Sequence, residues 1–237
     1  MSQIIFFRHA QASYLSDDYD QLSPKGEQQA RALGAYLVAE HILFDKVYVG
    51  PLKRQKHTFE IVADLYARHG LPMPDPAFLP ELREHSGPEA LRIALPQLIN
   101  DHPKIREWQA AAQANPALRK RNALLSFQYF MEIWAEGKIE VPGVESWAAF
   151  RQNVRKGLHK ILAETGRGEQ VGAFTSGGTI SAISAEALSI ADEKRVTAIN
   201  FSIRNTSFST FLYARTQFNL LSLNEIPHLP KDLITFV

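Results

Sequence analysis

The chain has 237 residues, of which 45% are hydrophobic and 22% charged, and this composition supports a large buried core. The net charge of +1 shows none of the basic excess that is typical of nucleic-acid-binding proteins, so we expect no nucleic-acid partner. The chain has no cysteine, which excludes disulfides, thiolate zinc sites and cysteine nucleophiles. The apolar run before Arg8 is too short for a signal peptide and no other stretch approaches a membrane span, so we expect a cytoplasmic protein with no membrane partner.

The N-terminal part of the chain alternates expected strands and helices. Residues 3–7 are a short apolar run rich in Ile and Phe, typical of a buried strand. A helix begins at Ser23 and Pro24, because serine caps helices and proline fits their first turn. Residues 45–49 predict a second strand, and residues 52–69 predict a second helix with an apolar side.

Residues 88–140 differ from the rest of the chain. They are helix-prone and carry an aromatic face that includes Phe127 and Trp134. We therefore expect a helical insertion that lies over the main sheet.

The C-terminal part resumes the alternation of strands and helices. Residues 146–162 predict a helix and residues 171–175 a strand, which Gly177 and Gly178 separate from a further helix that ends near Leu188. Two final strands are expected within 207–213 and 220–223.

This order of elements predicts a three-layer α/β/α fold. We expect one domain over residues 1–237, with a mostly parallel sheet, helices on both faces and the helical insertion at about 88–140. Ligands bind such sheets outside the carboxyl ends of the strands. That rule selects the segments 8–9, 50–54 and 175–178 as candidate site segments.

Three basic side chains in these segments suit phosphate chemistry. His9 follows the first strand, and an imidazole that is partly unprotonated near neutral pH has a nitrogen that can attack phosphorus. Arg8 offers a forked donor for phosphate oxygens. Arg54 begins a helix, where free N–H groups and the helix dipole attract anions. Taken singly, each is more often an ordinary surface residue.

Two further segments are candidates for the same pocket. Gly177 and Gly178 let backbone N–H groups approach a phosphate, although such a pair is more often only a tight turn. Glu84 follows a proline-rich loop, where a carboxylic acid can protonate a departing oxygen, although an inert exposed glutamate is the commoner case. The eight histidines show no zinc-protease spacing, so we expect no metal.

Together these pieces resemble the histidine phosphatase superfamily, also called the phosphoglycerate mutase-like family. The resemblance covers nearly the whole chain outside the insertion and depends on the order of five motifs. These are FFRHAQA at 6–12, LSPKGEQQA at 22–30, GPLKRQKHT at 50–58, LREHSG at 82–87 and ES at 145–146.

The resemblance implies a role for each candidate residue. His9 is the nucleophile that takes the phosphoryl group, and Arg8 and Arg54 hold its oxygens. Glu84 is the general acid for the leaving alcohol and later the base for water. The resemblance also implies that neither a metal nor an organic cofactor is needed.

One position departs from the family pattern. The segment 175–178 reads TSGG, so Ser176 stands where the family usually has a second histidine that stabilises the charge of the transferred group. Losing such a donor lowers the rate by a factor of about 10² to 10³. Ser176 and the backbone of Gly177 are then the expected substrate contacts here, and His57 or His85 is a candidate replacement base.

Three functions follow from these residues. The first is a phosphomonoesterase that works through a phosphohistidine on His9. The second, motivated by Ser176, is a weak or inactive pseudophosphatase that binds a phosphorylated ligand. The third, a phosphoglycerate-mutase-type phosphotransferase, matches the sequence after Glu84 poorly. In each case the expected partner is a phosphorylated small molecule or a phosphoprotein.

Overall fold

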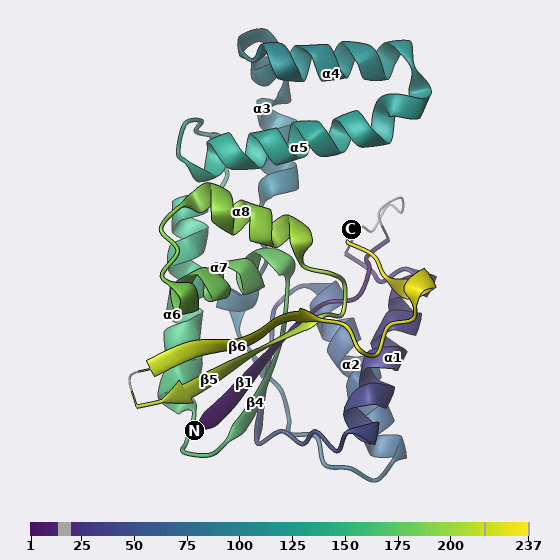
Figure 1. Cartoon of the computed structure of the whole chain (residues 1–237), viewed down its shortest axis with the longest axis vertical. Coiled ribbons are helices and arrows are strands. Elements are labelled where there is room, and N and C mark those ends of the chain that lie inside the picture. The colour runs from purple at the N-terminus through teal and green to yellow at the C-terminus, as the bar shows by residue number, and fades with distance from the viewer. Residues whose placement is uncertain (14–19, 216, 237) are drawn as a thin grey trace.

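A computed structural model of the protein describes residues 1–13, 20–215 and 217–236, which form a sheet between two layers of helices (Figure 1). This arrangement confirms the predicted α/β fold. The strands are β1 (Ser2–Arg8), β2 (Lys46–Val49), β3 (Ala77–Phe78), β4 (Gln170–Thr175), β5 (Phe208–Ala214) and β6 (Gln217–Glu225).

The strand order in the sheet is β3-β2-β4-β1-β5-β6. β3, β2, β4 and β1 pair in parallel, and β5 and β6 extend the sheet antiparallel. The register places Arg8 opposite Thr175 and Phe7 opposite Phe174. The carboxyl ends of β1 and β4 therefore meet at one edge, and the loops that follow them lie side by side.

The helices and short 3-10 helices cover the sheet or extend from it. The helices are α1 (Pro24–Ala39), α2 (Lys53–Arg68), α3 (Gly87–Asp101), α4 (Pro103–Ala114), α5 (Arg119–Ala135), α6 (Trp147–Glu164), α7 (Gly177–Leu188) and α8 (Glu193–Ser202). The 3-10 helices are η1 (Pro80–Leu82), η2 (Pro116–Leu118) and η3 (Lys231–Leu233). None of the described helices has the length and apolar content needed to cross a bilayer.

Strand β1 is buried on both faces, as its continuous apolar run predicts. Ile4 and Phe6 point into a core cluster shared with α6 and α7. Ile5 and Phe7 point to the opposite side, into a cluster shared with α1 and α2. Because successive side chains of a strand alternate, one short segment anchors both helical layers and fixes the position of its own carboxyl end.

The structure corrects the expected position of the insertion, which the sequence analysis placed over the main sheet. Residues 88–140 contain α3, α4 and α5, but Figure 1 shows that α4 and α5 extend beyond α8, away from the sheet. The three helices pack against one another, and α5 also contacts α8, which itself lies on α7. Their apolar side chains, among them Leu98, Ile105 and Phe130, are buried in these helix contacts.

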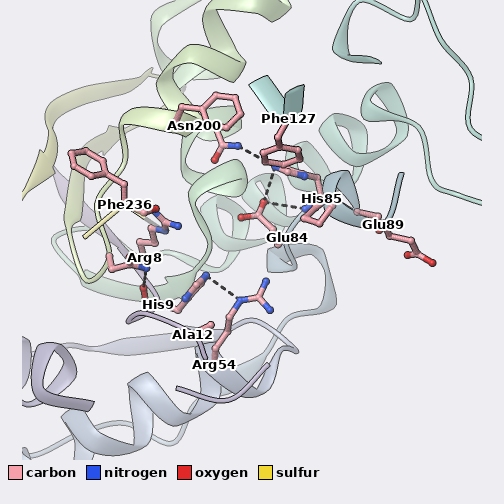
Figure 2. Close-up of a pocket in the computed structure, with 14 residues that line it drawn as sticks. Arg8, His9, Ala12, Arg54, Glu84, His85, Glu89, Phe127, Asn200 and Phe236 are labelled. Atoms are coloured by element: carbon pink, nitrogen blue, oxygen red, sulfur yellow. Dashed lines mark hydrogen bonds and ion pairs between the residues drawn. The ribbon is translucent and has the colours of Figure 1, made fainter. Parts of the chain in front are cut away.

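The C-terminal segment returns to the carboxyl edge of the sheet. The Gln29 side chain donates to the Leu233 carbonyl at 2.6 Å, and the backbone N–H of Asn205 donates to the Thr235 carbonyl at 3.0 Å. These bonds bring Phe236 next to Arg8 at the end of β1 (Figure 2).

Candidate active site

The end of β1 places Arg8 and His9 at the sheet edge. The backbone N–H of Arg8 donates to the Ser207 carbonyl at 2.9 Å, and that of His9 donates to the Thr175 carbonyl at 2.8 Å. The two residues are thus held between the segments that follow β4 and precede β5. Neither backbone has freedom to move without breaking the sheet edge.

The ring of His9 is buried, with 5% of the residue exposed, and its tautomer is defined by its neighbours. Nδ1 lies 2.7 Å from the Ala10 carbonyl, which can only accept, so Nδ1 carries the proton. Nε2 accepts a hydrogen bond from Nε of Arg54 at 3.1 Å (Figure 2). Its lone pair therefore points into the site.

The pKa of His9 lies well below its usual value. Burial of the ring is the largest cause, followed by the positive charges of Arg54 and Arg8, while the Ala10 carbonyl opposes the shift. His9 is consequently neutral at physiological pH. A neutral, oriented imidazole is the form that can act as a nucleophile.

Arg54 lies in the first turn of α2 and is fixed from two sides. Besides its bond to His9, its guanidinium forms an ion pair with Asp20 at 2.6 Å, and Asp20 also accepts the Lys53 backbone N–H at 2.8 Å. Sequence reasoning did not select Asp20, and no sequence signal separates it from other loop carboxylates.

Arg8 reaches across the sheet edge toward the C-terminal segment. Its guanidinium donates to the Ile203 carbonyl and, at 2.7 Å, to the Phe236 carbonyl. Its Nε lies close to Gly177, where a Cβ atom would be 3.4 Å from it and 2.9 Å from Oδ1 of Asn200. Gly177 therefore lies directly against Arg8.

Glu84 lies across the site and is held at the N-terminus of α7. Its carboxylate accepts the Gly178 backbone N–H at 3.2 Å and the His85 backbone N–H at 3.0 Å. A Cβ atom on Gly178 would lie 2.1 Å from the Glu84 carboxylate, so only glycine allows this approach. In this structure the α7 N-terminus thus holds a protein carboxylate at the place where the sequence suggested a phosphate.

His85 is the second buried histidine of the site. Its Nδ1 accepts the Gly87 backbone N–H at 3.0 Å. Its Nε2 lies 3.0 Å from Nδ2 of Asn200 and 3.5 Å from the Glu84 carboxylate. Burial lowers the pKa of His85 below its usual value, against the opposing effect of Glu84. His85 is therefore a buried, neutral ring beside Glu84.

Arg8, His9, Arg54 and Glu84 line one cavity of about 270 Å³ (Figure 2). The structure therefore brings these four predicted residues together. The sequence did not suggest several other lining residues, among them Asn200, Asn205, Phe127, Phe201 and Phe236. Of the two candidate replacement bases, His85 lines the cavity, whereas His57 lies on an outer surface of α2.

Ser176 and Gly177 are not among the described residues that line this cavity. Ser176 is fully buried, and its hydroxyl accepts a hydrogen bond from the Gln55 side chain at 2.7 Å. It therefore lies beneath the site rather than facing it. Across residues 1–13, 20–215 and 217–236, no group of three His, Asp or Glu side chains is arranged to hold a metal ion.

A sequence profile described as the histidine phosphatase superfamily (branch 1) matches residues 4–128 and 89–226, which together span most of the chain. The chain belongs to the histidine phosphatase superfamily. No curated protein sequence matches it significantly.

The fold of this protein is similar to that of several solved phosphatase and mutase structures. A phosphoserine phosphatase from Entamoeba histolytica has a TM-score of 0.62 and 16% identity, over 97% of this chain and 100% of that one. A phosphoglycerate mutase from Bacillus anthracis has a TM-score of 0.65 and 17% identity, over 96% and 94%. A mycobacterial glucosyl-3-phosphoglycerate phosphatase has a TM-score of 0.59 and 19% identity, over 94% and 98%.

Proposed function

We propose that this protein is a phosphomonoesterase that forms a phosphohistidine on His9. One observation carries the proposal: the unprotonated Nε2 of His9 lies 3.1 Å from the Arg54 guanidinium, in a cavity that Arg8 and Glu84 also line. A nucleophile, two phosphate-binding cations and a carboxyl group are thus gathered around one space. Membership of the histidine phosphatase superfamily supports the same chemistry.

The reaction runs in two steps. Nε2 of His9 attacks phosphorus, the bond from phosphorus to the alcohol oxygen breaks, and the protonated Glu84 carboxyl gives its proton to the leaving alcohol. Glu84, now a carboxylate, then takes a proton from a water molecule that attacks the same phosphorus. The N–P bond breaks, phosphate leaves and neutral His9 is restored.

The two arginines balance the charge that the phosphoryl group brings. When an ester enters, the N–H that Arg54 now donates to His9 turns to a phosphate oxygen and releases the Nε2 lone pair. Asp20 keeps the guanidinium oriented during this exchange. Arg8 contacts the same group from the end of β1.

A pseudophosphatase that binds a phosphorylated ligand is the second candidate. The observation that favours it is Ser176, which is fully buried beneath the cavity and outside its described lining, with its hydroxyl accepting from Gln55. His85 and Asn200 are further polar side chains in the lining. Without a second cationic histidine, turnover on this scaffold is expected to be slow.

Hydrolysis of a panel of phosphate monoesters by the unmodified protein and by His9→Ala tests both candidates. We expect His9→Ala to lose at least about 10³-fold in kcat/KM, because no other group replaces the nucleophile. His57→Ala removes a histidine outside the cavity and should keep full activity. Equal activity of His9→Ala and the parent would reject the mechanism, and micromolar ester binding without turnover would favour the pseudophosphatase.

A further inference from the structure

The outer part of the cavity is aromatic. Phe127 of α5, Phe201 of α8 and Phe236 of the C-terminal segment all line it, and we call these three residues the aromatic mouth. Phe127 and Phe201 meet edge to face, with ring centroids 5.6 Å apart. Figure 2 shows the Phe127 and Phe236 rings on the side of the cavity away from His9 and Arg54.

The charges of the cavity are unevenly distributed. Of the described residues that line it, only Arg8 and Arg54 carry a full positive charge: Arg54 bonds to His9, and Arg8 reaches the Phe236 carbonyl. Glu89, an exposed residue near the start of α3, adds a negative charge to the outer lining. A second anionic group on the side of Phe127 and Glu89 would therefore meet an aromatic ring and a carboxylate, while Arg204, outside the described lining, already stacks on the Phe236 ring at 5.3 Å.

We propose that the aromatic mouth binds the organic part of the substrate, and that this part is an uncharged aromatic group. The protein then acts on small arylalkyl or aryl phosphate monoesters, a conclusion that rests on the proposed function. Aromatic rings prefer edge-to-face and offset contacts with one another, which the Phe127–Phe201 pair offers to an incoming ring. A cavity of about 270 Å³ has space for a phosphoryl group and one ring system rather than a folded phosphoprotein segment.

The test compares three esters of primary alcohols, so that the leaving groups are similar. These are 2-phenylethyl phosphate, its 4-carboxyphenyl analogue and n-propyl phosphate. We expect kcat/KM for 2-phenylethyl phosphate to exceed that of each of the other two by about tenfold. Phe127→Ala should lower the ratio of phenylethyl to propyl turnover about fivefold, and Glu89→Gln should raise relative turnover of the carboxyphenyl ester.

Phe78→Ala is the matched control, because Phe78 is 58% exposed on β3 and outside the described lining. It should leave the ratio unchanged. If Phe127→Ala fails to fold, Phe127→Leu keeps an apolar side chain and should still lower the ratio. Equal turnover of the phenylethyl and propyl esters, or a ratio that Phe127 variants do not move, would overturn the proposal.

Calorimetric binding of the same esters separates the two proposals. Turnover without aromatic preference would reject the aromatic mouth while keeping the phosphatase. A preference in Kd without turnover would keep the aromatic mouth while rejecting the phosphatase. Absence of both turnover and binding would reject both.

Discussion

At the scale of single residues, the buried side chain of Gln55 joins three loops of the site. Its carbonyl accepts the Leu52 backbone N–H at 3.0 Å, and its amide donates to the Leu82 carbonyl at 2.9 Å and to the Ser176 hydroxyl at 2.7 Å. A Cβ atom on Gly50 would lie 2.1 Å from the same carbonyl oxygen. Gly50, Gln55 and Ser176, the last of which departs from the family pattern, therefore form one packing arrangement.

This arrangement predicts that Ser176→His alone does not restore a catalytic histidine. The new ring enters space already filled by Gln55 and leaves the Gln55 amide without one acceptor, which lowers the free energy of unfolding by about 1 to 3 kcal/mol. The double variant Gln55→Ala/Ser176→His removes the obstruction and should be the more active of the two. Urea unfolding and kcat measure both effects. A single variant that is as stable as the parent and faster would contradict the account.

Gly178 gives a second prediction. A methyl group there would meet the Glu84 carboxylate at 2.1 Å, so Gly178→Ala should displace Glu84 and lower kcat about 10²-fold. Gly137→Ala is the control: it has a φ of 69° with nothing within 4 Å, so it should lower stability without lowering kcat. Retention of full kcat by Gly178→Ala would show that the position of Glu84 is not required.

At the scale of elements, the sequence predicts those helices whose first residues carry a local capping signal. Ser23 caps α1 by accepting the Gly26 N–H, and Ser146 caps α6 by accepting the Ala149 N–H. Helix α8 was not predicted: Asp192 caps it by accepting the Lys194 N–H, but the helix has only ten residues, and among its apolar side chains only Val196 is fully buried. The position of the insertion depends on its contact with α8, so the sequence alone could not provide it.

The layer of α6, α7 and α8 is fastened by one buried cation. Arg151 of α6 pairs with Glu186 of α7 at 2.9 Å and with Glu193 of α8 at 2.8 Å. Arg151→Ala leaves both carboxylates without this partner and should lower the free energy of unfolding by about 2 to 4 kcal/mol. Arg155→Ala, which removes a half-exposed partner of the same Glu186, should lower it by less than about 1 kcal/mol. Denaturant unfolding measures both losses of stability. An equal loss in the two variants would contradict this view.

At the scale of the whole molecule, the cavity combines residues that differ in how predictable they are. Arg8 and His9 stand at the end of a strand and Arg54 stands at the start of a helix, where the rule for parallel sheets selected them. The family motifs selected the same residues and Glu84. Asn200 and the aromatic mouth come from α8, the insertion and the C-terminal segment. Their arrival at the cavity depends on long-range packing, which no short sequence pattern encodes.

Buried histidines make the stability of the whole molecule depend on pH. The pKa values of His9, His85 and His228 are all lowered, mainly by burial, and that of His228 falls to about 4. The unfolded chain therefore binds more protons than the folded one below a pH of about 6.5. Stability is full above that pH and decreases as pH falls from about 6.5 toward the folded pKa values.

His228 allows this dependence to be isolated, because it lies outside the described lining of the cavity and stacks on Phe208. His228→Phe keeps a ring there but cannot take up a proton. Between pH 7 and pH 5 this variant should lose about 2 kcal/mol less stability than the parent. Urea unfolding at the two pH values measures the difference. Parallel pH profiles for the two proteins would contradict the assignment.

Rapid-quench labelling with a radiolabelled phosphate ester tests most directly whether the phosphoryl group passes through His9. We expect an acid-labile, alkali-stable label to appear on the peptide that contains His9 before free phosphate is released, and to be missing in His9→Ala. Hydrolysis by the parent protein without any label on that peptide at any quench time would contradict the account.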